Sequence, residues 1–298
     1  MHNPSVKRDW LTANSSLQTL GVLENYPMAQ IDFSKLAKLA EQNCEPLYLS
    51  HPFMRDGHSA NKANATISYV KYRGTVYGIT CAHVYDQQFG ESGDTEKVLT
   101  VWGERLIYQF GNWAQDGYQS HFRLLRSSGS SSESLDIAVI KLLAPFPELH
   151  LARKGKIPID LDHWEEPDWN SISTCVVSGY PTEHKEQSDS HVAANLLQIV
   201  AKLTRPLSAG TNDFMLASTL PEKNDYFFSG VSGGPVYCIH SDYTMTLVGV
   251  VFEGSPGSST EWEKRGQESF FSKEDVQFRA YLLTPSIFAK WIDCAGFV

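Results

Sequence analysis

The sequence carries a glycine-rich turn that decides both its fold class and its chemistry, Gly230-Val231-Ser232-Gly233-Gly234-Pro235-Val236. Gly230 lies two residues before Ser232, and glycine leaves room for a backbone turn that aims two N–H groups at one point. Paired N–H groups of this kind are the donors that a developing oxyanion needs. The run is also compatible with an ordinary tight turn, so its meaning depends on the rest of the chain.

Two further runs supply the partners that a serine nucleophile requires. They read Thr80-Cys81-Ala82-His83-Val84 and Leu135-Asp136-Ile137-Ala138-Val139. A serine hydroxyl is a weak nucleophile at neutral pH, so it needs a base such as histidine, and the histidine needs a carboxylate to fix its tautomer. Each run alone has a structural reading, as a packed histidine or a turn aspartate. Their order favours His83, Asp136 and Ser232 as a catalytic set.

Short strand-like runs surround these motifs, and no helices alternate with them, which favours barrels or sandwiches over βαβ units. A helix is expected near residue 33, capped by Asp32, and a second after Thr284-Pro285, where an N-cap precedes a first-turn proline. The predicted strands cover 67–72, 75–80, 98–102, 106–110, 137–142, 173–178, 196–203, 214–217, 236–240 and 246–252.

Together the three motifs resemble those of the trypsin/chymotrypsin-like serine peptidases. Carried over residue by residue, the resemblance implies His83 as general base, Asp136 as its orienting carboxylate and Ser232 as nucleophile. The backbone N–H groups of Gly230 and Ser232 would form the oxyanion hole. Further matching runs lie at Cys175–Tyr180, Leu247–Gly254 and Ala280–Pro285, so the resemblance covers residues 60–298.

The resemblance implies an all-β chain of two antiparallel six-stranded β-barrels with a C-terminal α-helix. The first barrel would carry His83 and Asp136, and the second would carry Ser232. The expected division is an N-terminal extension with a short helix over 1–55, the first barrel over 56–150, a connector over 151–170, the second barrel over 171–283 and the helix over 284–298.

The predicted substrate pocket is not of the basic-residue type. In the family, the residue six positions before the nucleophile lies at the pocket floor, and an aspartate there selects Lys or Arg. This chain has Tyr226 at that position, followed by Phe227, so small or apolar side chains are favoured. Asp225 is one residue away, and a shifted loop would restore a basic preference. Phe252 and Gly254 complete the predicted substrate-binding set.

The activation switch of digestive family members is missing from the sequence. In those members a newly cut amino terminus pairs with the aspartate before the nucleophile, whereas this chain has Val231 there and no Ile-Val-Gly-Gly-like run ahead of the first barrel. We expect packing around Val231, the N-terminal extension or a bound partner to hold the turn. The remaining reading is that Val231 only fills the core and the enzyme is always active.

The five cysteines include no Cys-x-x-Cys pair, so neither a metal nor another cofactor is expected. The resemblance implies that Cys175 and Cys238 are neighbours, since family cysteines at these positions form a disulfide. The absence of a signal peptide favours reduced thiols, and an oxidising compartment would permit a bridge. Cys44, Cys81 and Cys294 are predicted to be free thiols.

Composition limits the partners. With 42% hydrophobic and 20% charged residues the 298-residue chain can bury a sizeable core, and a net charge of −9 disfavours nucleic acid and anionic membranes. No apolar run has membrane length, and no signal peptide is visible, so we expect a cytoplasmic protein; a trimmed secreted form stays open.

Two functional classes fit these observations. The first is an active serine endopeptidase acting on proteins or peptides. The second is a catalytically silent relative that uses the fold as a binding or regulatory module. The intact set of His83, Asp136, Ser232 and Gly230 favours the enzyme. A narrower reading makes the enzyme a switch that a regulatory protein partner or ligand turns on.

Overall fold

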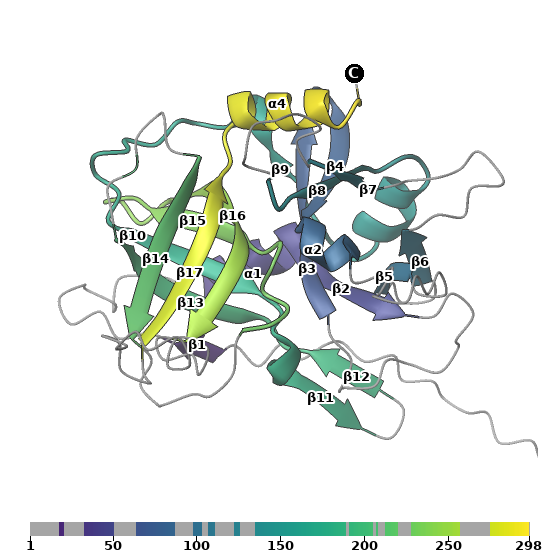
Figure 1. Ribbon diagram of the computed structural model, residues 1–298, viewed down its shortest axis with the longest axis horizontal. Helices are drawn as coiled ribbons and strands as arrows, with labels where there is room; N and C mark the ends of the chain where they lie inside the picture. Colours follow the sequence, from purple (N-terminus) through teal and green to yellow (C-terminus); the bar gives the residue numbers. More distant parts are fainter. Residues whose placement is uncertain are drawn as a thin grey trace, which may run out of the picture.

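The chain folds into two mostly antiparallel β-sheets that lie side by side, with few helices (Figure 1). No helix in the ranges below is long and apolar enough to cross a membrane. Tyr226 and Phe227 of the predicted pocket, and Asp225 beside them, lie outside the described residues. The computed structural model describes residues 18–20, 33–50, 64–86, 98–102, 107–110, 122–125, 135–188, 191–204, 207, 212–219, 228–256 and 275–297.

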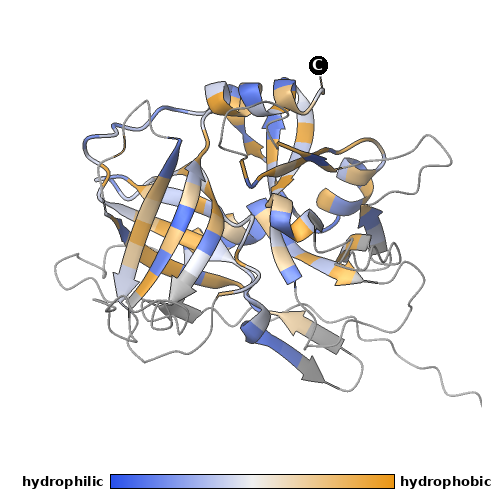
Figure 2. Cartoon of the chain, viewed as in Figure 1, coloured by the Kyte–Doolittle hydropathy of each residue, from blue (hydrophilic) through white to orange (hydrophobic). Residues whose placement is uncertain are grey.

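The sheet of the C-terminal half is a closed barrel. Its strand order is β13-β10-β15-β16-β17-β14, and β14 pairs back with β13. Buried and more exposed residues alternate along β14, and Figure 2 shows hydrophobic and hydrophilic residues interleaved on these strands. The strands are β10 (Thr174–Gly179), β13 (Leu197–Leu203), β14 (Asp213–Thr219), β15 (Pro235–Ile239), β16 (Met245–Pro256) and β17 (Asp275–Leu282), with β1 (Gln18–Leu20) added parallel to β13.

The sheet of the N-terminal half is a half-barrel. Its order is β6-β5-β2-β3-β4-β8-β7, and within the described ranges no pairing joins the end strands β6 and β7. The predicted fold class is confirmed, although this first sheet stays open where a closed barrel was expected. Its strands are β2 (Cys44–Ser50), β3 (Asn64–Tyr72), β4 (Thr75–Thr80), β5 (Val98–Trp102), β6 (Ile107–Phe110), β7 (Phe122–Leu124) and β8 (Ala138–Lys141), and β9 (Ile159–Asp160) pairs parallel with β3.

The first sheet begins earlier in the chain than the expected boundary at residue 56. Strand β2 lies inside the segment assigned to the extension, yet it pairs with both β3 and β5. The helix before it, α1 (Phe33–Asn43), buries Leu36 and Ala40 in a cluster that also contains Tyr237 of β15. The Tyr237 hydroxyl donates to Asn43 Oδ1 at 2.9 Å. This part of the extension is therefore core structure that joins the two sheets.

The C-terminal helix α4 (Pro285–Cys294) packs on the same cluster between the sheets, through buried Phe288, Trp291 and Ile292. The predicted cap is present, because Thr284 Oγ1 accepts from the Ile287 N–H at 3.2 Å. The short elements are α2 (Ala82–Asp86), η2 (Pro147–Leu151), η3 (Leu161–His163), η4 (Thr182–His184), and the hairpin of β11 (Lys185–Ser188) and β12 (His191–Ala194).

The predicted neighbourhood of two cysteines is confirmed. Cys175 on β10 and Cys238 on β15 are register partners on adjacent antiparallel strands. Both are buried free thiols, as is Cys44, whereas Cys294 is an exposed free thiol.

Candidate active site

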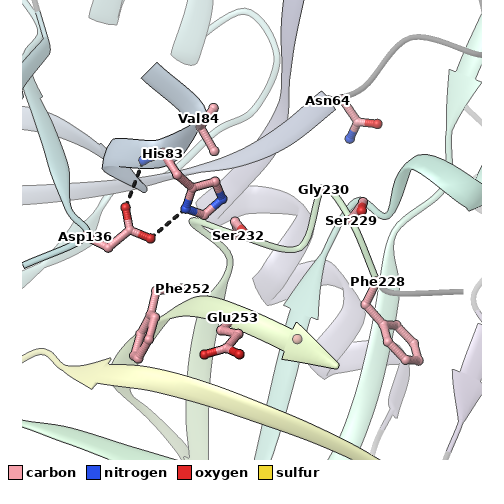
Figure 3. A pocket seen from close by; sticks show the side chains of 11 residues that line it. Asn64, His83, Val84, Asp136, Phe228, Ser229, Gly230, Ser232, Phe252 and Glu253 are labelled. Carbon is pink, nitrogen blue, oxygen red and sulfur yellow. Dashed lines mark hydrogen bonds and ion pairs between the residues drawn. The ribbon is translucent and has the colours of Figure 1, made fainter. Parts of the chain in front are cut away.

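The pairing of β4 with β8 brings the candidate base and its carboxylate together. Thr80, at the end of β4, is the register partner of Ala138, at the start of β8. His83 follows on α2, and Asp136 precedes β8 by two residues, so both leave the sheet at the same edge. His83 Nδ1 lies 2.6 Å from Asp136 Oδ2, and the His83 backbone N–H donates to Asp136 Oδ1 at 2.8 Å (Figure 3). Two contacts therefore fix the imidazole relative to the carboxylate.

The carboxylate of Asp136 is held in its ionised form. Burial by itself would raise the pKa of Asp136. The hydrogen bond and charge of the His83 ring, with the backbone N–H groups of His83 and Ala82, outweigh burial and leave the pKa below its ordinary value. An ionised Asp136 accepts from Nδ1–H, which leaves Nε2 as the ring nitrogen able to take a proton.

The candidate nucleophile lies in the same pocket as this pair. Ser232 follows the buried Val231 in the turn before β15. The pocket has a volume of about 530 Å³ (Figure 3). Its lining residues are Asn64, His83, Val84, Asp136, Phe228, Ser229, Gly230, Ser232, Phe252, Glu253 and Gly254.

The turn around Ser232 requires its glycines. Gly230 and Gly233 have φ of +98° and +89°, in the region that side-chain-bearing residues rarely adopt. A Cβ at Gly230 would lie 2.5 Å from Tyr180 O, and one at Gly233 would lie 2.0 Å from Thr66 O. The two sheets thus approach the turn so closely that only glycine fits at these positions.

Two N–H groups of the turn point away from hydrogen-bonded carbonyls. Ser229 O accepts from the Thr182 N–H at 2.5 Å, and Val231 O accepts from the Gly234 N–H at 2.8 Å. In a trans peptide the N–H points away from the preceding carbonyl, so Gly230 N–H and Ser232 N–H face the other side. Among the described residues neither group donates a hydrogen bond. Gly230 and Ser232 both line the pocket.

The Ser232 hydroxyl makes no hydrogen bond with His83 among the described residues, and the nearby Cys81 thiol donates to Val251 O at 3.2 Å. Hydrogen bonds between nucleophile and base are often loose until substrate binds. Burial raises the pKa of Cys81 well above its ordinary value, and the charge of Asp136 adds to this effect. The thiol is therefore protonated beneath the site and does not compete as a nucleophile.

Three possible metal ligands meet at this point of the structure. One donor atom each from Cys81, His83 and Asp136 lies within 4.8 Å of the others. Two of these donors are already joined by the His83–Asp136 hydrogen bond, and a protonated thiol is a poor ligand. We assign no metal to the cluster, and the absence of a metal requirement stays a prediction.

Two phenylalanines line the pocket, Phe228 and Phe252, and each packs against a second ring. Phe228 packs edge-on against Phe278 at 5.4 Å, and a Cβ at Gly254 would meet the Phe278 ring at 3.0 Å. Phe252 stacks on Tyr281 at 4.2 Å between ring centroids. Glu253 also lines the pocket, which holds a second carboxylate at Asp136.

Glu253 is partly neutralised by a cation. Its carboxylate is 3.3 Å from Arg279, which also pairs with Asp213 at 3.0 Å. All three side chains are about half exposed, so solvent screens these pairs. The pairing therefore reduces the negative charge that Glu253 presents to the pocket.

Six of the eight residues predicted from the sequence meet in this pocket, and Tyr226 and Phe227 lie outside the described residues. Sequence reasoning did not single out Asn64, Ser229 or Glu253. Glu253 lies between Phe252 and Gly254, which the sequence predicts as substrate-binding residues, so its position in the strand already indicated a place in the pocket. Asn64 had no such signal, because it comes to Tyr180 from 116 positions away along the chain.

Comparison with known proteins assigns the chain to a family. The trypsin family model, described as "Trypsin", matches residues 55–265. The chain belongs to the trypsin family, whose members have the serine protease fold. No curated protein matches its sequence.

Solved structures that resemble the chain do so at low identity. A serine protease of mouse brain, neuropsin, is 13% identical with a TM-score of 0.40, covering 85% of this chain and 95% of its own. A mutant of human heparin binding protein (CAP37) is 10% identical with a TM-score of 0.40, covering 83% and 89%. Because the identities and TM-scores are low, the assignment to the family rests on the family model.

Proposed function

We propose that the chain is an active serine endopeptidase. The single observation that carries this proposal is the 2.6 Å contact between His83 Nδ1 and Asp136 Oδ2 in the pocket of Ser232. The N–H groups of Gly230 and Ser232, which donate to no acceptor among the described residues, also support it. The presence of base, carboxylate, nucleophile and donors in one pocket favours an active enzyme over a catalytically silent relative.

The residues divide the reaction between them. Ser232 Oγ attacks the scissile carbonyl while His83 Nε2 takes its proton, and the Gly230 and Ser232 N–H groups stabilise the oxyanion. His83 then protonates the leaving amine, and an acyl group remains on Ser232. Water, activated by His83, hydrolyses this ester and restores the free serine. Asp136 stays ionised throughout and stabilises the imidazolium.

We propose proteins or peptides with a small or apolar residue before the cleaved bond as substrates. Phe228 and Phe252, the two phenylalanines among the lining residues, support an apolar preference. The pairing of Glu253 with Arg279 weakens the attraction of the pocket for a basic side chain. A cleavage profile dominated by Lys and Arg would overturn this preference and point to Asp225 as the selecting group.

Labelling with a fluorophosphonate probe tests the proposal, because the probe reacts with an activated serine and needs no known substrate. Wild-type protein should be labelled stoichiometrically, and Ser232→Ala should not be labelled. Ser229→Ala is the matched control, since Ser229 is an exposed serine three positions earlier in the same pocket; it should be labelled like wild type. Equal labelling of Ser232→Ala, or none of wild type, would contradict the proposal.

Peptide-library cleavage then separates an active enzyme, which cleaves peptides, from a silent module, which does not.

We also propose that the enzyme needs no cofactor and is cytoplasmic, and that any regulatory partner acts on an already formed site. A chelator should leave turnover unchanged. Strong inhibition by the chelator would instead indicate a required metal ion.

A further inference from the structure

Strand β3 presents a row of buried polar side chains to the other sheet. Asn64, Thr66 and Ser68 alternate along the strand and therefore point to the same face. Their exposed fractions are 8%, 0% and 0%. Three buried polar groups in succession are costly unless each finds a partner, so their partners have to be identified.

Each of these side chains donates to a backbone carbonyl of the second sheet and its loops. Asn64 Nδ2 donates to Tyr180 O at 2.5 Å, and Thr66 Oγ1 donates to Gly230 O at 2.7 Å. Ser68 Oγ donates to Gly233 O at 2.6 Å. The acceptors lie between 116 and 165 positions away along the chain.

The acceptors are the residues that shape the oxyanion hole. Gly230 and Gly233 flank Ser232 on either side, and the Thr66 backbone N–H donates to Ser232 O at 2.9 Å. The strand thus contacts three of the four residues from 230 to 233. It leaves Val231 to pack in the core of the second barrel.

Thr66 has a second contact that links it to the Gly230 N–H. Its Oγ1 also accepts from the Tyr180 N–H at 3.0 Å. Two residues later the Thr182 N–H donates to Ser229 O, which fixes the plane of the peptide that carries the Gly230 N–H. One buried hydroxyl therefore holds both the carbonyl of Gly230 and the segment that orients its N–H.

We propose that Asn64, Thr66 and Ser68 form a clamp from the first sheet that holds the oxyanion-hole turn in its active geometry, with Thr66 as the positioning residue. The proposal rests on the proposed endopeptidase function. Neutral hydrogen bonds hold the turn here, and the uncharged Val231 takes no part in an ion pair. The docking of the two sheets thus assembles the oxyanion hole without a cut that creates a new amino terminus.

The test compares Thr66→Val with Thr66→Ser in the full chain. Valine keeps the shape and removes the hydroxyl, whereas serine keeps the hydroxyl. A misdirected N–H donor stabilises the transition state less and hardly changes substrate binding. Thr66→Val should therefore lower kcat by about tenfold to a hundredfold and leave KM within about twofold. Thr66→Ser should restore kcat to within about threefold of wild type.

Ser218→Ala is the matched control for a purely structural effect. Ser218 is buried on β14, and its hydroxyl donates to Val200 O at 2.6 Å, remote from the pocket lining. The variant loses a hydroxyl-to-carbonyl bond of the same kind, and its kcat should stay within about twofold of wild type. Should Thr66→Val fail to fold, Ser68→Ala replaces it and should lower kcat by at least about fivefold, because it frees Gly233 O.

The outcomes separate this proposal from the proposed function. If the wild type is active and Thr66→Val has a normal kcat, the clamp alone is overturned. Where Thr66→Val does not fold, a normal kcat in Ser68→Ala overturns the clamp in the same way. A kcat loss in Ser218→Ala equal to that in Thr66→Val also overturns it, since the effect would then be general destabilisation. Absence of fluorophosphonate labelling in the wild type overturns the endopeptidase and with it the clamp.

Discussion

Two histidine–carboxylate pairs of almost the same length lie in this molecule, and their surroundings differ. His83 and Asp136 are 2.6 Å apart, with side chains 41% and 29% exposed. His150 and Glu45 are 2.7 Å apart, with side chains 0% and 1% exposed. Only the first pair lines the pocket that holds Ser232.

The carboxylate of the buried pair has several donors around it, whereas His150 Nδ1 has no hydrogen-bond partner among the described residues. Glu45 accepts from the Tyr69 hydroxyl, from His150 Nε2 and from Lys154 Nζ at 2.7 Å. The His150 ring is stacked on Phe146 at 4.8 Å. Because both side chains are at most 1% exposed, solvent does not reach this pair, and we assign it to the core of the first sheet. The pairing of histidine with carboxylate is thus insufficient to indicate catalysis; access to a serine and to free N–H donors is also needed.

The largest contrast is expected from removing the charge of Asp136. Asp136→Asn would disfavour the tautomer with Nδ1–H and the imidazolium, and should lower kcat by about 10⁴-fold. Because both side chains are partly exposed, the free energy of unfolding should change by no more than about 1 kcal/mol. Steady-state kinetics and thermal unfolding measure the two effects. Retention of more than a tenth of the activity would contradict the role given to Asp136.

The opposite pattern is expected for Glu45→Gln. Removing this charge leaves Lys154 without its carboxylate in a buried cluster, and should lower the free energy of unfolding by about 3–5 kcal/mol. Activity per folded molecule should stay near that of wild type. Asp160→Asn is the control, since this partly exposed carboxylate pairs with Lys71 at 3.2 Å and its replacement should cost at most about 1 kcal/mol. Equal losses in both variants, measured by urea unfolding, would show that burial does not matter here.

The smallest effect concerns pH. Burial acts to raise the pKa of Glu45, but the charge of Lys154 and the hydrogen bond from His150 lower it well below its ordinary value of 4.5. The stability that this provides is complete above pH 4.5 and is lost as the pH falls below it, by at most about 1.4 kcal/mol per pH unit. Glu45→Gln should therefore lose less stability than wild type between pH 6 and pH 3. Identical acid slopes would contradict the lowered pKa.

Much of the fold was predictable because its signals are local. The runs at 75–80 and 98–102 coincide with β4 and β5, and Thr284 caps α4 as expected. Strand β2 was missed because Glu45 and Pro46 interrupt its apolar pattern. Glu45 is buried there only because Lys154 and His150 meet it from more than a hundred positions away.

In the candidate site, too, residues in local motifs were predictable and residues that depend on distant contacts were not. His83, Asp136 and Ser232 each stand in a local motif, so the sequence alone was enough to choose them. Thr66 and Ser68 look like ordinary polar residues of a strand. Their importance comes from the carbonyls of Gly230 and Gly233, which only the docking of the two sheets brings to them.

The central claim is tested most directly by measuring turnover of a cleavable peptide by three variants: Ser232→Ala, His83→Ala and the double variant. Nucleophile and base act as one unit, so each single variant should lose about 10⁴-fold to 10⁶-fold in kcat, and the double variant should be no more than about tenfold worse than the lower single. All three should unfold at nearly the wild-type temperature. Substantial turnover by Ser232→Ala, or losses that multiply in the double variant, would contradict a shared Ser232–His83 mechanism.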